Sequence, residues 1–124
     1  MNVEIVRGAI DADALSLPAW EIESGTSTAA EMLAYSEIFN IQINGETVLT
    51  YGVEIERGEK TIAWITLAVG SLPGFDLTAG LLPIIEHQLA FADVIAVRSM
   101  RPGLAKKLKK QGYSTSYILT KAKQ

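Results

Sequence analysis

The sequence predicts an α+β fold, built on a mixed, mostly antiparallel sheet of about six strands with helices on both faces. Two observations carry this prediction. Three alternating segments, rich in β-branched and aromatic residues, follow one another in the middle of the chain with only tight turns between them. Helical and strand-like segments then alternate toward the C-terminus, which adds crossover connections to the meander. At 124 residues the chain is expected to form one domain, residues 1–124.

The N-terminal third is expected to hold one strand and two helices. The strand covers residues 3–6, and a short helix is expected around residues 11–15. A second helix is expected after residues 26–28, where Thr-Ser-Thr offers capping hydroxyls. Glu31 follows in the first turn, as in a capping box.

The middle of the chain predicts an antiparallel meander. Its strands are expected over residues 35–43, 47–56 and 60–69. Asn44-Gly45 lies between the first two, and this dipeptide is the strongest short signal of a β-hairpin. The third strand carries the run ITLAV, which is apolar on both faces and therefore indicates a central position in the sheet.

A loop rich in Gly and Pro, residues 70–80, leads into the second half. Residues 81–92 have helical spacing of apolar side chains. Because Pro83 is tolerated best in a first turn, this helix is expected to begin near residue 80. A short buried strand is expected over residues 93–99.

The C-terminal segment predicts a helix followed by a last strand. Pro102 suits the first turn of the helix, and Gly112 suits its C-terminal cap. Leu104 and Leu108 lie four apart and are expected to face the sheet, with four lysines on the outer side. Residues 113–121 then alternate as a strand does.

Composition excludes several classes of protein. The chain has no cysteine, which excludes a disulfide scaffold and thiolate metal sites and fits an intracellular protein. No secretory signal and no run of about 18 apolar residues is present, so no membrane span is expected. His87 is the only histidine and is expected at the surface of a helix rather than at a metal.

Charge is distributed unevenly along the chain. Residues 1–97 hold all 14 acids and three bases, a net charge of −11, whereas residues 98–124 hold eight bases and no acid. The basic segment either packs beside the acidic body or offers a face to an anionic partner. Nucleic acid is disfavoured, because no aromatic residue lies among the lysines and the whole chain is acidic. An acidic partner protein is the more modest alternative.

The segment R-P-G-L-A-K-K-L-K-K-Q-G-Y, residues 101–113, carries a resemblance to a known family. Together with the order of elements, it resembles the late helix of the GNAT acetyltransferase superfamily, commonly N-x-x-A-x-x-L-Y-x-K-x-G-F. Gly112-Tyr113 takes the place of Gly-Phe, and Lys110 takes the lysine position. The sequence is also similar to small GNAT-like proteins of tailed phages, some of which are linked to virion or head assembly. The resemblance covers about residues 2–121.

Three features of the family pattern are altered. The loop that commonly reads Q/R-x-x-G-x-G/A corresponds here to F-D-L-T-A-G, in which only Gly80 fits and Asp76 would repel phosphates. The family asparagine that often contacts coenzyme A aligns with Arg101. The family tyrosine, commonly the general acid for the leaving thiolate, aligns with Leu108.

The resemblance nevertheless implies a site for acetyl-CoA or another acyl-CoA. The strand at 60–69 should splay from the strand at 93–99 and admit an extended pantetheine arm beside the backbone. The candidate cofactor-binding residues are Leu67, Val69, Gly70, Thr78, Ala79, Gly80 and Arg101. Free amides at the start of the helix would hold phosphate, with Arg101 as the replacement charge. The alternative is a loop that only caps the helix, through Thr78 or Asp76.

Acid–base chemistry on an amine substrate needs a base and an acid. Glu54 is the candidate base among the glutamates of the meander, where a solvated strand face is the alternative. Tyr113 is the candidate acid, with Tyr117 beside it, where packing with a satisfied hydroxyl is the alternative. The same alternative applies to Tyr51.

Two functions of different classes follow. The first is an acyl-CoA-dependent N-acyltransferase with degenerate cofactor and catalytic motifs. The second is a non-catalytic GNAT-like protein of phage type, with a structural or head-assembly role. The first is expected in the cytoplasm, and the second would be associated with the virion. A homodimer through the last strand is a further expectation.

Overall fold

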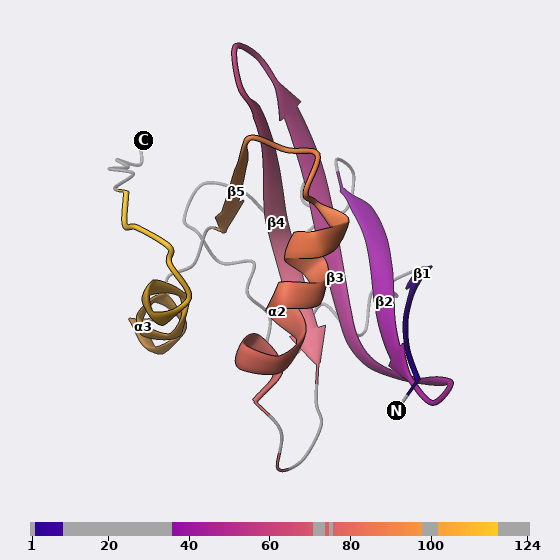
Figure 1. Ribbon diagram of the computed structural model, residues 1–124. Helices are drawn as coiled ribbons and strands as arrows, with labels where there is room; N and C mark the ends of the chain where they lie inside the picture. The colour runs from indigo at the N-terminus through magenta and orange to yellow at the C-terminus, as the bar shows by residue number, and fades with distance from the viewer. Residues whose placement is uncertain (1, 9–35, 71–73, 75, 98–101, 117–124) are drawn as a thin grey trace, which may run out of the picture.

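The computed structural model describes residues 2–8, 36–70, 74, 76–97 and 102–116, and these hold five strands and two helices (Figure 1). The helices expected around residues 11–15 and after residues 26–28 lie outside these ranges. Arg101 and Tyr117 lie outside them too, and the side chains of Leu67 and Val69 are also not described.

The predicted three-stranded meander forms as β2 (Glu37–Ile43), β3 (Glu46–Arg57) and β4 (Thr61–Gly70), each antiparallel to the next. Strand β1 (Val3–Arg7) also pairs antiparallel with β2, a pairing that the sequence did not predict. The turn between β2 and β3 has positive φ angles at Asn44 (52°) and Gly45 (82°). Those angles belong to a type I′ hairpin turn, whose twist matches the twist of the strands.

Strand β5 (Val94–Val97) completes the sheet in the order β1-β2-β3-β4-β5 and runs parallel to β4. Helix α2 (Leu77–Gln88) makes the crossover from β4 to β5. The start of the parallel pair is clasped, because Asp93 donates its amide to the carbonyl of Thr61 (2.9 Å) and accepts the amide of Thr61 on Oδ2 (2.8 Å). The predicted mixed, mostly antiparallel α+β sheet is therefore confirmed.

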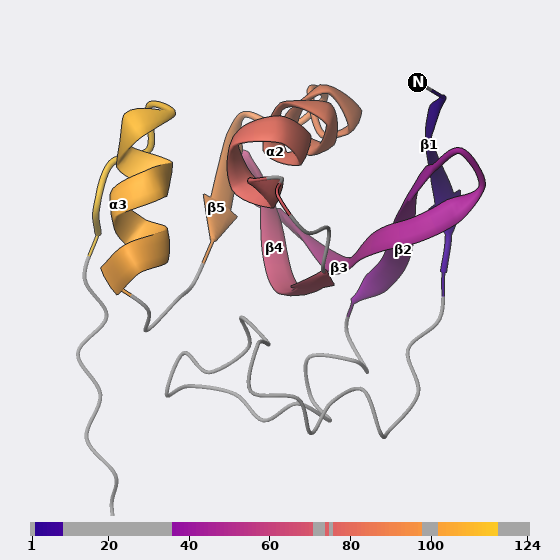
Figure 2. The ribbon, with the colours of Figure 1, turned by 90° about the horizontal axis from the view of Figure 1, so that it is seen from below.

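The core lies between the sheet and α2, which covers one of its faces (Figure 2). The helix buries Leu81, Leu82, Ile85 and Leu89. The sheet contributes apolar residues of β2, β3 and β4, among them Ile41, Tyr51, Val53, Ala63 and Ile65. Each buried aliphatic side chain of this size contributes about 1.5–3 kcal/mol of transfer free energy. The apolar face predicted for α2 is confirmed. Leu82 is also buried, although it was not predicted on that face, and Ile84 is only partly buried.

Helix α2 begins earlier than the sequence predicts. It starts at Leu77, after the N-cap Asp76, and Pro83 lies inside it. Pro83 has no N–H to donate one turn back, which usually breaks a helix. Here the capped first turn and the buried apolar face hold the helix on both sides of the proline, so the predicted start near residue 80 is wrong.

Helix α3 (Pro102–Lys110) begins at its proline and is closed by Gly112, as predicted. Gly112 has a φ of 96°, and the amide of Tyr113 returns to the carbonyl of Leu108 (3.1 Å), which ends the helix as a left-handed cap does. Leu108 is buried, and the four lysines are exposed. The predicted amphipathic helix is therefore confirmed.

The strand predicted over residues 113–121 is wrong for its first part. Residues 113–116 have no strand structure, and residues 117–121 lie outside the described ranges. The side chain of Tyr113 is bound to α2 instead, and residues 114–116 are exposed and make no described strand pair. The described residues thus hold five strands of the six predicted.

Candidate functional site

Strand β5 pairs with β4 along the whole of its described length, and β4 extends beyond it. The register joins Ile62 to Val94 and ends with Ile65 opposite Val97, whereas β4 continues to Gly70 (Figure 1). Next to the last pair, Thr66 is an extra residue in β4, because Val53 and Gly52 of β3 face Ile65 and Leu67. A bulge of this kind bends a strand. Within the described residues, the backbone of β4 from Thr66 to Gly70 is therefore not paired with β5.

The far end of β4 packs tightly against the start of α2. A Cβ atom on Gly70 would lie 2.6 Å from the carbonyl oxygen of Val48, 2.8 Å from Leu49 Cδ1 and 2.9 Å from Leu77 Cδ1. Only glycine fits such a position. The end of β4 thus lies against the first turn of α2.

The first turn of α2 is capped by Asp76. Its Oδ1 accepts hydrogen bonds from the amides of Thr78 (3.1 Å) and Ala79 (3.2 Å), and its carbonyl accepts from Gly80 (2.9 Å). The hydrogen bond from Ala79 is the largest of the effects that lower the pKa of Asp76. The prediction of free amides at Thr78 and Ala79 is therefore wrong in this structure, and the alternative of a cap by Asp76 is confirmed.

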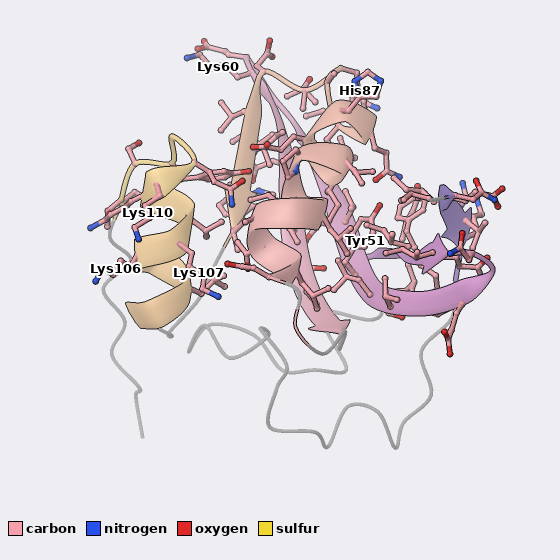
Figure 3. All side chains as sticks on the ribbon, turned by 60° about the horizontal axis from the view of Figure 1, so that its bottom comes forward. Tyr51, Lys60, His87, Lys106, Lys107 and Lys110 are labelled. Atoms are coloured by element: carbon pink, nitrogen blue, oxygen red, sulfur yellow. The ribbon has the colours of Figure 1, made fainter. Side chains whose placement is uncertain are left out.

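Helix α3 reaches this turn with two side chains. Lys107 Nζ lies 3.5 Å from Asp76 Oδ1, and Gln111 Nε2 donates to the carbonyl of Thr78 (3.0 Å). Lys106 points away from the body of the molecule, whereas Lys107 lies on the side of α3 toward α2 (Figure 3). One lysine of the basic helix is thus bound to the acidic body.

The hydroxyl of Tyr113 donates to Glu86 Oε2 on α2 at 2.9 Å. Burial raises the pKa of Tyr113, and the hydrogen bond and the negative charge of Glu86 raise it further. A higher pKa makes proton transfer to a thiolate less favourable. The candidate acid is therefore held in its protonated form by a neighbour that also weakens it as an acid.

Glu54 lies on the other side of the sheet. Tyr51 faces α2, where its hydroxyl donates to Gln88. Side chains alternate along β3, so Val53 and Ile55 share the face of Tyr51 and Glu54 projects from the opposite face. Because Tyr113 is bound to α2, the structure does not bring the two candidate catalytic side chains together. Tyr51 itself is a packed residue with a satisfied hydroxyl, as its alternative reading predicts.

Solved structures of acetyltransferases resemble the chain over almost its whole length. They include the glucosamine-6-phosphate N-acetyltransferase of Arabidopsis thaliana, with 16% identity and a TM-score of 0.57. AAC(6')-Iy, in complex with the bisubstrate analogue CoA-S-monomethyl-acetylneamine, has 13% identity and a TM-score of 0.58. An aminoglycoside acetyltransferase from an uncultured soil metagenomic sample has 15% identity and a TM-score of 0.59. Each alignment covers at least 99% of this chain and 99% of the other.

The chain has the GNAT acetyltransferase fold. At these identities the likeness establishes the architecture and leaves the chemistry to the residues themselves. No family model and no curated protein matches the sequence.

The residues expected to hold acyl-CoA suit it at one end of β4 and α2 and not at the other. The backbone of β4 around Leu67, Val69 and Gly70 pairs with β3 and with no described residue of β5, so that edge suits an extended pantetheine arm, which carries amide groups of its own. The start of α2 already carries a carboxylate, so the phosphates would have to displace Asp76. The position of the family tyrosine holds Leu108, which is buried and has no proton to give.

Sequence reasoning missed the polar contacts between α2 and its surroundings. Gln88, Glu86 and Lys107 have no motif that marks them, and their partners lie between 27 and 37 residues away. The only available signal was Asp76 immediately before the helix, a residue type preferred at N-caps.

The sequence predicts neither a metal site nor a membrane-spanning helix. The described residues contain no group of His, Asp and Glu side chains that could hold a metal ion, and His87 is exposed on α2 (Figure 3). Among the described helices, none is long and apolar enough to cross a membrane.

Proposed function

We propose that this chain is an acyl-CoA-dependent N-acyltransferase whose donor lies along the end of β4 that extends beyond β5. The observation that carries the proposal is the bulge at Thr66, beyond which no described residue of β5 pairs with β4. The GNAT fold of the chain, seen in several acetyltransferases, supports it. In the reaction, an amine nitrogen forms a bond to the thioester carbonyl carbon, and the carbon–sulfur bond breaks.

The chain's own residues would take the following roles. The backbone of Leu67, Val69 and Gly70 would orient the pantetheine arm, and the start of α2, with Thr78, Ala79 and Gly80, would face the phosphates. Arg101 would supply positive charge there. Tyr113 would give a proton to the leaving sulfur, and the proton of the amine would pass to water, because Glu54 lies on the opposite face of the sheet from the helix that holds Tyr113.

The test is the thermal unfolding of the purified chain with acetyl-CoA. A ligand present at 100 times its dissociation constant adds about 2.7 kcal/mol to the free energy of unfolding. We expect the midpoint to rise with acetyl-CoA and free thiol to appear when a panel of primary amines is added. No shift with either acetyl-CoA or S-acetylpantetheine at millimolar concentration would exclude this function.

A second candidate is a non-catalytic GNAT-like protein of phage type, with a structural or head-assembly role. Three contacts favour it: Asp76 occupies the amides of α2, Glu86 weakens Tyr113 as an acid, and Leu108 packs into the core. It predicts no thiol release with any amine, together with a coding sequence among capsid and portal genes. Release of thiol by the wild-type chain would exclude it.

A further inference from the structure

The first turn of α2 already holds an anion of its own. A single oxygen, Asp76 Oδ1, takes the amides of Thr78 and Ala79 at 3.1 and 3.2 Å and lies 3.5 Å from the ammonium group of Lys107. Two backbone N–H groups and a cation are the donors that a phosphate oxygen takes at a helix N-terminus. The carboxylate therefore occupies the place that the diphosphate of acyl-CoA would need.

The arrangement is held from the side of α3 as well. Gln111 donates to the carbonyl of Thr78 at 3.0 Å, one helical turn after Lys107. Helix α3 is thereby bound to the turn that Asp76 caps. Displacing the carboxylate would cost two hydrogen bonds and the ion pair with Lys107.

The carboxylate is charged at neutral pH. Its pKa is lowered, chiefly by the hydrogen bond from Ala79 and further by Lys107 and Thr78, although desolvation, the second-largest effect, acts in the opposite sense. A diphosphate brought to the same amides would meet a like charge at contact distance. A pantetheine thioester without phosphates would bring no negative charge to this turn and would meet no such repulsion.

We propose that Asp76 sets the donor specificity of this chain, by competing with the diphosphate of acyl-CoA for the first turn of α2. The wild-type chain then binds a phosphate-free pantetheine thioester at least as tightly as acyl-CoA. This inference rests on the proposed function, since it takes the pantetheine arm to lie along β4.

The test compares two probes, acetyl-CoA and S-acetylpantetheine, by titration calorimetry on the wild-type chain and on Asp76→Asn. Asparagine caps a helix as well as aspartate does, so the variant removes the charge and keeps the cap. We expect Asp76→Asn to bind acetyl-CoA about tenfold more tightly, with the affinity for S-acetylpantetheine unchanged. A thermal melt of the variant checks that the fold is intact.

Two further variants serve as controls. Glu59→Gln changes the net charge equally but lies in the exposed turn between β3 and β4, and it should leave both affinities unchanged. In Asp76→Asn the ammonium group of Lys107 has lost its carboxylate partner and can meet the phosphates. Adding Lys107→Gln should therefore weaken the binding of acetyl-CoA and leave that of S-acetylpantetheine unchanged.

Three results would overturn the inference: equal acetyl-CoA affinity in Asp76→Asn and wild type, equal tightening of both probes, or a tenfold preference of the wild type for acetyl-CoA. Binding of both probes with no effect of Asp76 removes this inference and leaves the proposed function standing. Binding of neither probe by any variant removes both.

Discussion

Two tyrosines show how single residues join the sheet and α3 to helix α2. The hydroxyl of Tyr51 donates to Gln88, and the hydroxyl of Tyr113 donates to Glu86. Burial is the main cause that raises the pKa of each, with Gln88 opposing the rise at Tyr51 and Glu86 adding to it at Tyr113. Both phenols therefore keep their protons to a higher pH in the folded chain than in the unfolded one.

The first prediction at this scale is a loss of stability in alkali. The unfolded chain releases its phenolic protons near pH ~10, whereas the folded chain retains those of Tyr51 and Tyr113 to higher pH. Above that pH the unfolded state binds fewer protons, so the free energy of unfolding falls as pH rises. Urea titrations from about pH 9 to pH 11 should show a steeper fall for wild type than for Tyr51→Phe or Tyr113→Phe. Equal slopes in all three chains would contradict the assignment.

The second prediction concerns Tyr113 as the acid. Tyr113→Phe should lower the rate of acyl transfer by about 100-fold and leave the affinity for acetyl-CoA unchanged. Glu86→Gln keeps a hydrogen-bond acceptor but removes the charge that raises the pKa of Tyr113, so it should increase the rate. Thiol release under saturating donor measures both. An unaltered rate in Tyr113→Phe would assign the proton to another group.

At the scale of elements, Gly70 lies where the end of β4 meets β3 and the start of α2, with no room for a side chain. Gly70→Ala would force a methyl group against the carbonyl of Val48 and two leucine side chains. Overpacking of this kind typically costs about 1–3 kcal/mol. Gly103→Ala, in the first turn of α3 with nothing within 4 Å, should instead stabilise the chain by about 0.5–1 kcal/mol. Urea unfolding of the two variants checks both signs, and a Gly70→Ala chain as stable as wild type would show that β3 can shift there.

Element boundaries show what local patterns can predict. The hairpin at Asn44-Gly45 and the helix from Pro102 to its cap at Gly112 depend on backbone preferences of those residues alone. The start of α2 was misplaced because the rule for Pro83 competes with the cap by Asp76, and tertiary packing decided between them. Residues 113–116 alternate as a strand does, yet the bond from Tyr113 to Glu86, 27 residues away, holds their beginning against a helix.

For the whole molecule, the order of elements was enough to predict the architecture. A meander followed by a helical crossover places β4 between an antiparallel and a parallel neighbour, as the register confirms. The sites were less accessible to prediction, because they depend on which polar groups meet across the fold. The separation expected between β4 and β5 follows from topology. The hydrogen bonds at the α2 amides follow instead from one side chain, Asp76, whose capping role the sequence offered only as an alternative.

The clasp between Asp93 and Thr61 gives the molecule a fixed pivot. It joins the parallel strands where both begin, and the bulge at Thr66 lies at the other end of their pairing. We expect β4 and β5 to separate first beside the bulge, because two hydrogen bonds hold them where both begin. A wider ligand could then enter beside Thr66 while the two strands stay paired where they begin. The same register would return when the ligand leaves.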